Sequence, residues 1–330
     1  MKSFLKTFFF CCLLMLALPA VQVHAEWFSE DTQLMGTSVS VELWGEDEAR
    51  SRQLIAAVLA EFQRLDLMMN PWNPASELAR INREAGRAAV VTTPEILWVV
   101  ERALYYSRLS EGAFDISFAS VGQHYDYRQG RAPGDEVIAR DRDNIDYRAI
   151  ELDLDAGSIR FAKPGLQVDL GGIAKGYAVD RGIDLLQRAG VESAVISAGG
   201  DSRILGDLGD RPRTIGIRHP RNRNEYAVMI PLADTAISTS GDYERFFMQG
   251  EVRVHHILDP DTGRSAQGLQ SASVLAPLAV DSDALSTTVF VLGVERGLQL
   301  VNSLPGVDAI LIDGSGKLHY SAELLLSTRP

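Results

Sequence analysis

The sequence predicts an α+β fold, because strand and helix patterns are both abundant but do not alternate in the steady βαβ order of a doubly wound sheet. After residue 25 the chain has no internal repeat, no low-complexity segment and no linker rich in Pro, Gly and Ser. Of its 330 residues 46% are apolar, which is enough for a packed core. We therefore expect residues 26–330 to form one domain.

The individual elements follow from local patterns. Strands are expected where apolar and polar residues alternate or where a short apolar run ends at a turn. Helices are expected where apolar residues recur every three or four positions after a capping residue. The expected strands are 37–43, 168–170, 193–197, 214–218, 226–231, 236–239, 255–258 and 273–276, with hairpins over 151–162 and 308–321. The expected helices are 47–69, 76–82, 93–110, one from Gly172 to near Gly190, and one that begins at Asp283. Residues 115–150 show no clear pattern.

Residues 1–25 have the organisation of a secretory signal peptide. Lys2 and Lys6 precede an apolar run from Phe8 to Leu18 that is short for a membrane span. Cleavage after Ala25 would give a periplasmic protein, and the alternative is a retained inner-membrane anchor. Both cysteines lie inside the run rather than at a lipoprotein cleavage site. The mature chain would then have no thiol for a disulfide, a nucleophile or a metal.

The net charge restricts the classes of partner. The formal charge is −12 for the whole chain, and removal of Lys2 and Lys6 with no acidic residue makes the mature chain more negative still. A chain this acidic repels nucleic acids and anionic membrane surfaces. Arginines are nevertheless scattered along it, so an anionic small molecule can find local partners. We expect no nucleic-acid partner.

The segment VDLGGIAKGYAVD, from Val168 to Asp180, carries the strongest functional signal. A short apolar strand turns through Gly171-Gly172 into a helix whose first turn contains Lys175. Glycines allow a ligand to approach the backbone closely, and a helix start presents free N–H groups and a partial positive charge. This combination predicts a site for a phosphorylated ligand. The alternative is an ordinary strand-to-helix turn with a solvated lysine, and the spacing matches neither a P-loop nor GxGxxG.

Asp283 and Thr287 lie four residues apart in the sequence DALST and share one face of the expected helix. A carboxylate and a hydroxyl are hard oxygen ligands that suit Mg²⁺, and Ser286, Asp281 and the carbonyl of Gly172 could complete the set. A magnesium site beside a phosphate site indicates a pyrophosphate ligand. The alternative is that Asp283 only caps the helix.

His255 and His256 end an expected strand, so one should point into the protein and the other out of it. A histidine of ordinary pKa can take a proton from an attacking hydroxyl, and a structural histidine bonded to the nearby turn is the alternative. Trp72 stands among prolines, where it could stack on a flat ring or pack against the fold. The segments Ser238–Asp242 and Ala113–Ile116 could bind a ligand or serve only as turns.

Taken in order, these pieces resemble the FAD:protein FMN transferase family, the ApbE-like flavin transferases. The resemblance spans nearly all of the mature chain, and the succession of motifs is more specific than any one of them. The matching segments are Met35-Gly36-Thr37, NPWNPASELARIN at Asn70, GAFDIS at Gly112, VDLGGIAKGYAVD, SAGGD at Ser197, STSGDYERFF at Ser238, HHILDPDTG at His255 and DALSTTVFVLG ending at Gly293.

The resemblance implies a site as well as a fold. The fold would be a mixed-sheet α+β architecture related to the T-fold, with FAD in a cleft between two sub-parts. The implied flavin contacts are Met35, Trp72, Ala113, Phe114, Asp115, Asp169, Lys175 and Ile257. The implied magnesium ligands are Gly172 (through its carbonyl), Asp283, Ser286 and Thr287, and His256 is the candidate for proton handling. The position of Trp72 is often Tyr in such proteins.

The resemblance also implies a reaction. Such enzymes use Mg²⁺ and FAD, move FMN onto a Thr or Ser hydroxyl of a target protein and release AMP. Their acceptors include subunits of ion-pumping NADH:quinone and Rnf-type complexes. Two other functions stay open: an FAD pyrophosphatase, in which water replaces the protein hydroxyl, and a flavin-binding module without turnover. The intact DALST and DLGG motifs favour catalysis but do not separate transfer from hydrolysis.

Overall fold

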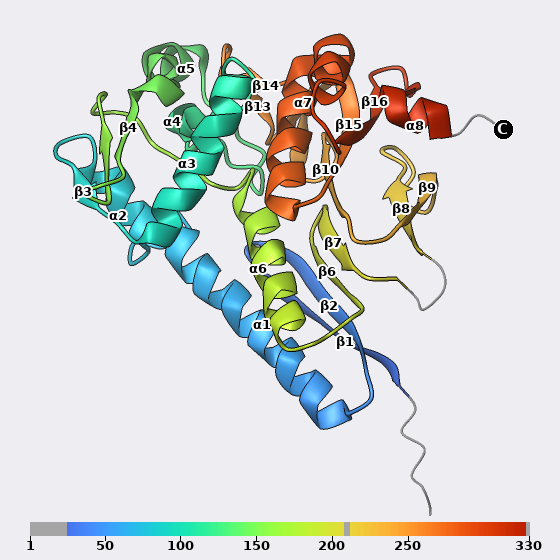
Figure 1. The fold of residues 1–330 in the computed structure, drawn as a ribbon. Helices are drawn as coiled ribbons and strands as arrows, with labels where there is room; N and C mark the ends of the chain where they lie inside the picture. The colour runs from blue at the N-terminus through green and yellow to red at the C-terminus, as the bar shows by residue number, and fades with distance from the viewer. Residues whose placement is uncertain (1–24, 208–211, 328–330) are drawn as a thin grey trace, which may run out of the picture.

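The computed structural model describes residues 25–207 and 212–327 (Figure 1). The expected signal peptide therefore lies outside the described residues, except for Ala25. The described chain is built around one large sheet with helices on one face, a hairpin on the other and a group of short helices beside it. This arrangement confirms the predicted α+β class.

The main sheet has eight strands in the order β1-β2-β6-β7-β10-β15-β16-β17. Every pair of neighbours in it is antiparallel, so the sheet itself is not mixed. Such pairing needs no βαβ crossover, which is why helix and strand patterns fail to alternate along the sequence. The strands are β1 (Glu26–Leu34), β2 (Thr37–Gly45), β6 (Ala194–Ala198), β7 (Asp201–Leu205), β10 (Ala236–Gly241), β15 (Leu269–Ala276), β16 (Asp308–Asp313) and β17 (Leu318–Tyr320).

Three long helices cover one face of this sheet: α1 (Glu48–Met69), α6 (Ala174–Arg188) and α7 (Ala279–Val301) (Figure 1). Their buried apolar residues join those of the sheet in the largest core cluster. The other face packs against the hairpin β8 (Arg213–Arg218) and β9 (Tyr226–Leu232) and against α8 (Ala322–Ser327), which form a second cluster. The middle of the sheet is thus covered on both faces, and β15 is buried along its whole length, whereas most of the edge strand β1 is not buried.

Beside the sheet lies a second part of the chain (Figure 1). It contains α2 (Glu77–Glu84), α3 (Pro94–Leu109), α4 (Ala119–Gly122), α5 (Asp135–Asp141), three 3₁₀ turns (Ile116–Phe118, Arg142–Asn144, Tyr147–Ala149) and a small sheet of β3 (Val90–Val91), β4 (Ile150–Asp153) and β5 (Ser158–Phe161). Two short hairpins follow β10 in the chain: β11 (Phe246–Gln249) with β12 (Val252–His255), and β13 (Leu258–Asp259) with β14 (Arg264–Ser265). Residues 115–150, which showed no pattern, form the short helices.

Three of the expected elements are wrong. The expected strand 255–258 is broken, since β12 ends at His255 and β13 begins at Leu258. Residues 168–170 pair with no strand in the described chain, and Asp169 is instead held by its N–H, which donates to the carbonyl of Ile116 at 2.9 Å. The last long helix begins at Ala279 rather than at Asp283, so Asp283 lies in its second turn and does not cap it. That helix is the one described segment long and apolar enough to cross a membrane, but it packs on α6, β10 and β15.

Candidate active site at the crossing of two helices

The site begins where α6 and α7 cross. Gly176 on α6 lies so near α7 that a Cβ on it would be 2.1 Å from the carbonyl oxygen of Ala279. Asp180, one turn further along α6, accepts the backbone N–H groups of Ala279 and Val280 at 2.9 and 2.8 Å, and Arg203 donates to it at 2.7 Å. Because α7 has no capping side chain of its own, Asp180 caps it from the neighbouring helix. The two helices are therefore fixed in one register.

This register places Lys175 in contact with two acidic side chains from distant parts of the chain. Its Nζ lies 2.9 Å from Asp201 Oδ2 and 3.2 and 3.3 Å from the two carboxylate oxygens of Asp283, and it also donates to the carbonyl of Gly171 at 3.0 Å. Asp201 begins β7 directly after the Gly199-Gly200 turn. Lys175 is therefore not a solvated lysine, and the carboxylates of Asp201 and Asp283 are both buried.

The charges in this centre do not balance. Two carboxylates face one ammonium group, so the fully ionised centre carries a net negative charge, which is costly in a buried place. Burial, and then the charge of Asp201, raise the pKa of Asp283 to about 7. Burial alone would lower the pKa of Lys175, but the charges of Asp201 and Asp283 raise it above its ordinary value. A further cation can therefore bind here with a gain in electrostatic energy.

Hydroxyl groups lie next to the centre. Ser240 Oγ on β10 is 2.9 Å from Ser286 Oγ and 3.2 Å from Thr287 Oγ1 on α7. A Cβ on Gly172 would be 3.5 Å from Thr287 Oγ1, so the Gly-Gly turn adjoins this helix face. Carboxylate, hydroxyl and carbonyl oxygens form the hard donor set that suits Mg²⁺. The residues predicted as magnesium ligands therefore come together, and their chemistry fits the ion.

Two details of the expected site are corrected by the geometry. Asp281 is bonded to Arg102 at 2.6 Å and so is not available as a ligand. The start of α6 is not an empty phosphate cradle, because the N–H of Gly176 already donates to Asp283 at 3.0 Å and that of Ala174 donates to Leu170. Asp283 itself takes the place of the expected anion. A phosphate group at this end of α6 would therefore lie beside Asp283 and would not bind the N–H groups of the first turn.

Several predicted flavin contacts surround the centre. Asp169 Oδ1 accepts the N–H of Gly171 at 2.6 Å, and burial raises its pKa. Phe114 is buried and lies against the Gly-Gly turn, since its ring would be 3.1 Å from a Cβ on Gly172. Ala113 precedes it in the same loop. The carboxylate of Asp115 is engaged by the N–H and hydroxyl of Ser117 and by the N–H of Tyr147, so its side chain fixes this loop.

His256 and Ile257 follow β12. His256 is partly buried; its Nδ1 is enclosed and has no hydrogen-bond partner within the described chain. Burial, and then the positive charge of Arg245, lower its pKa to about 3. His255 is the one of the pair that points into the protein: it is 2% exposed, its Nε2 donates to the carbonyl of Ala266 at 2.9 Å, and its ring packs edge-on against Phe290. Its imidazole is structural.

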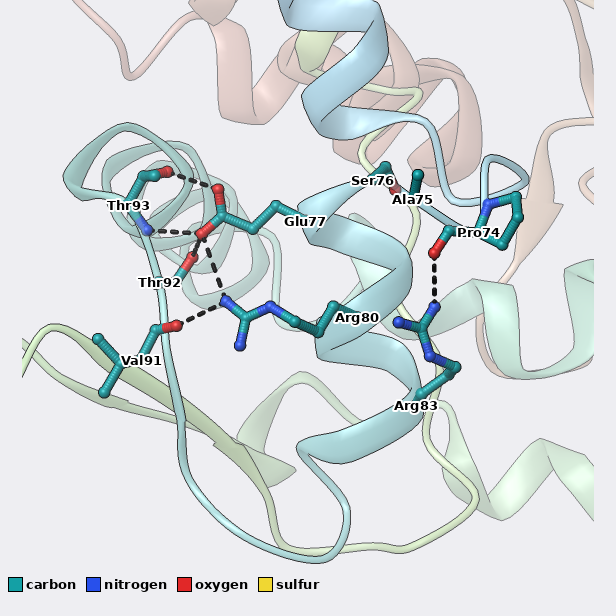
Figure 2. Close-up of a pocket in the computed structure, with 9 residues that line it drawn as sticks. All are labelled: Pro74, Ala75, Ser76, Glu77, Arg80, Arg83, Val91, Thr92 and Thr93. Atoms are coloured by element: carbon teal, nitrogen blue, oxygen red, sulfur yellow. Dashed lines mark hydrogen bonds and ion pairs between the residues drawn. The ribbon is translucent and has the colours of Figure 1, made fainter.

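The side chain of Trp72 is largely exposed to solvent. It is 69% exposed, so the alternative that Trp72 packs against the fold is wrong, and its predicted flavin contact stays a prediction. A hollow of about 570 Å³ begins at Pro74, two residues further along the chain, and Figure 2 shows the residues that line it. Two arginines line it, but Arg80 and Arg83 both donate to backbone carbonyls there. No residue that was predicted to contact flavin or metal lines this hollow.

Sequence reasoning gave no role to Asp180, Asp201 or Arg245. Asp180 is the last residue of the VDLGGIAKGYAVD segment, and Asp201 is the last residue of the SAGGD segment. Their position as acidic residues within these motifs is the one feature of the sequence that could have indicated a role. Arg245 is an exposed arginine in a turn and gave no signal of its own.

Replacing Asp180 by Asn is expected to loosen the start of α7. The amide has one acceptor oxygen for the N–H groups of Ala279 and Val280, and a buried donor left without a partner costs about 1–3 kcal/mol. Thermal unfolding should then occur several degrees lower. Asp184→Asn, on the same helix but with a half-exposed side chain, is the matched control and should melt like the wild type. An unchanged melting temperature for Asp180→Asn would contradict the capping role.

Comparisons with known proteins agree with this fold. A model of the ApbE family matches residues 35–311. The FAD:protein FMN transferase of Treponema pallidum is 31% identical, and the match covers 90% of this chain and 88% of the relative. The protein of the same name from Klebsiella pneumoniae is 30% identical and covers 92% of this chain and 94% of its own length.

Solved structures are equally similar. The crystal structure of the ApbE protein from Thermotoga maritima has a TM-score of 0.84 and 31% identity, with 92% of this chain and 100% of that one covered. The flavin transferase ApbE from Vibrio cholerae has a TM-score of 0.82 and 27% identity, with 92% and 99% covered. The molecule is thus an α+β enzyme. The chain belongs to the ApbE family.

Proposed function

We propose that this protein moves FMN from FAD to the hydroxyl of a Thr or Ser side chain in an exported target protein and releases AMP. Its membership of a family whose relatives are named FAD:protein FMN transferase supports the flavin chemistry. The proposed metal-assisted transfer rests on one observation. The buried centre of Lys175, Asp201 and Asp283 has an excess of negative charge and lies beside three hydroxyl groups.

The residues divide the work of phosphoryl-type transfer between them. Asp283, Ser286, Thr287 and the carbonyl of Gly172 would hold Mg²⁺, which neutralises diphosphate oxygens and polarises the phosphorus–oxygen bond when it is bound. Lys175 is then shared between Asp201 and the substrate. In the reaction the acceptor oxygen forms a bond to the FMN phosphorus, the bond to the bridging oxygen breaks, and AMP carries that oxygen away. Such transfer depends mainly on charge neutralisation and in-line positioning.

The remaining assignments concern the substrate and its surroundings. Met35, Trp72, the loop of Ala113 to Asp115, Asp169 and Ile257 would contact FAD, and His256 would take the acceptor's proton. The acceptor would be a subunit of an ion-pumping NADH:quinone or Rnf-type complex. The N-terminal segment supports a periplasmic location. The negative charge disfavours nucleic acid and anionic membrane surfaces, so membrane contact would occur only through the acceptor or a retained N-terminal segment.

Trp72→Ala should weaken FAD binding by about 1–3 kcal/mol, the scale for stacking an aromatic ring on a base. Because the wild-type side chain is 69% exposed, the same change should leave the melting temperature unaltered. Flavin fluorescence quenching measures the dissociation constant directly. Trp98→Ala, which removes a 43% exposed tryptophan that packs on Tyr177, is the control and should bind FAD normally. Equal affinity for FAD in Trp72→Ala and in the wild type would show that Trp72 does not stack on the bound flavin.

The products of FAD turnover test the proposed reaction. Mature protein incubated with FAD and Mg²⁺ alone should release little free FMN, and addition of an acceptor domain should release AMP in equal amount to the flavin bound. Chromatography of the small molecules measures both. Rapid formation of FMN and AMP without an acceptor would make the protein an FAD pyrophosphatase, and stable FAD under both conditions would make it a flavin-binding module.

A further inference from the structure

Arg245 joins two segments that carry predicted substrate contacts. It lies in the turn between β10 and β11. Its Nη2 donates to the carbonyl of Gly36 at 3.1 Å, at the tip of the β1–β2 hairpin next to Met35. Its own carbonyl accepts the N–H of His256 at 3.1 Å. One arginine thus contacts the hairpin tip with its side chain and the histidine segment with its backbone.

The guanidinium of Arg245 is also a cation without a carboxylate partner. None of the ion pairs between described residues includes it, whereas nearby Arg221 and Arg253 are both held by Asp242, at 2.6 and 3.7 Å. A guanidinium has five N–H donors, and the hydrogen bond to Gly36 uses one of them. Its charge acts on His256 and on Asp169 and lowers the pKa of each, so Arg245 lies near both residues.

The hairpin tip that Arg245 contacts is strained. Met35 has φ 52° and Gly36 has φ 70°, so both residues of the turn are left-handed. Glycine adopts this conformation freely, but a methionine there costs about 1 kcal/mol or more. A turn of this kind usually contains Asn or Asp at the first position. The side chain of Met35 is partly buried and packs against the main core, so the fold holds this strained turn in place next to Arg245.

We propose that Arg245 is a further substrate-binding residue whose guanidinium binds the diphosphate of the dinucleotide between the Met35 turn and His256. This inference rests on the proposed function for the identity of the dinucleotide. The planar guanidinium presents parallel N–H groups to phosphate oxygens, which an ammonium group cannot do. Lys175 stays paired with Asp201 even when it also contacts the substrate, whereas Arg245 has no carboxylate partner among the described residues and can give its whole charge to the diphosphate.

Equilibrium binding of FAD and of riboflavin, which has no phosphate, tests this assignment. It is measured by flavin fluorescence on the full-length mature protein without Mg²⁺ or acceptor, so that turnover does not contribute. Arg245→Gln should weaken FAD binding roughly 10- to 100-fold, the range for a lost hydrogen bond to a charged group, and leave riboflavin binding nearly unchanged. The FAD affinity of Arg245→Lys should lie between that of Arg245→Gln and that of the wild type. Lysine keeps the positive charge but cannot present two parallel N–H groups to a phosphate.

Arg188→Gln is the matched control. It removes the same charge from the far end of α6, about 20 Å along the helix from Lys175, where the side chain is 76% exposed. It should bind both flavins like the wild type. Equal weakening of FAD and riboflavin in Arg245→Gln would make Arg245 a support for the turn and overturn the proposal, as would unchanged FAD binding. Wild-type protein that binds FAD but transfers no FMN would contradict the proposed function alone.

Discussion

Asp283→Ala is expected to abolish turnover. Asp283 is the only carboxylate among the proposed magnesium ligands, and the metal contributes several kcal/mol to the transition state, which is about a thousandfold or more in rate. The flavin ring and adenine keep their contacts, so FAD should still bind. The readout is the initial rate of FMN transfer as a function of Mg²⁺ concentration.

Asp281→Ala is the control for this change. Asp281 lies two residues earlier on the same helix, but it is bonded to Arg102 and does not face the centre. Its loss should lower stability slightly and leave the magnesium dependence intact. Asp283→Asn keeps the shape of the side chain and separates loss of charge from loss of the bond to Gly176. Full activity in Asp283→Ala, or wild-type activity that EDTA does not diminish, would refute the magnesium assignment.

His256→Ala is expected to lower the transfer rate by about 10²–10⁴-fold, the usual contribution of a general base, with little effect on FAD affinity. Loss of FAD binding together with rate, or an unchanged rate, would make the residue structural. His255→Ala is not a neutral control, since it opens a cavity against Phe290 and should lower the melting temperature.

The pH dependence of this enzyme follows from the lowered pKa of His256. A free imidazole of ordinary pKa would give kcat/KM an acid limb near pH 6.5, but the folded enzyme holds this pKa near 3. The kcat/KM profile should therefore show no imidazole limb at 6.5. Bound diphosphate favours the protonated ring, so the limb of kcat should lie at higher pH than that of kcat/KM. A kcat/KM limb at 6.5 that disappears in His256→Ala would contradict this environment.

The same lowered pKa affects stability. Between about pH 3 and the unfolded value near 6.5, the unfolded chain binds a proton at His256 that the folded chain does not. Stability should therefore be fully present above 6.5 and decrease as the pH falls through this window. The buried His255, whose pKa burial also lowers, contributes in the same direction.

Much of the fold could be predicted because its signals are local. Asp47 and Thr93 cap α1 and α3 through their own side chains, so both helices begin where the sequence indicates. The start of α7 could not be read in this way, because its cap is Asp180 on another helix. Residues 168–170 resembled a strand from their apolar pattern, but a strand also requires a partner.

The site could be predicted in part for the same reason. Gly172, Asp283, Ser286 and Thr287 were chosen by residue chemistry, and the fold brings them together. The contact between Lys175 and Asp283 spans 108 residues of sequence, and no spacing rule indicates it. The neutral state of His256 depends likewise on burial and on the charge of Arg245, which appear only in three dimensions.

Covalent flavin on the acceptor tests the central claim most directly. The mature protein is incubated with FAD, Mg²⁺ and a candidate acceptor domain, and the acceptor is then separated on a denaturing gel and examined for flavin fluorescence and for an added FMN mass. The account predicts a fluorescent acceptor whose labelling requires Mg²⁺ and disappears when the acceptor threonine is replaced by valine. An unlabelled acceptor, with FMN free in solution, would contradict it.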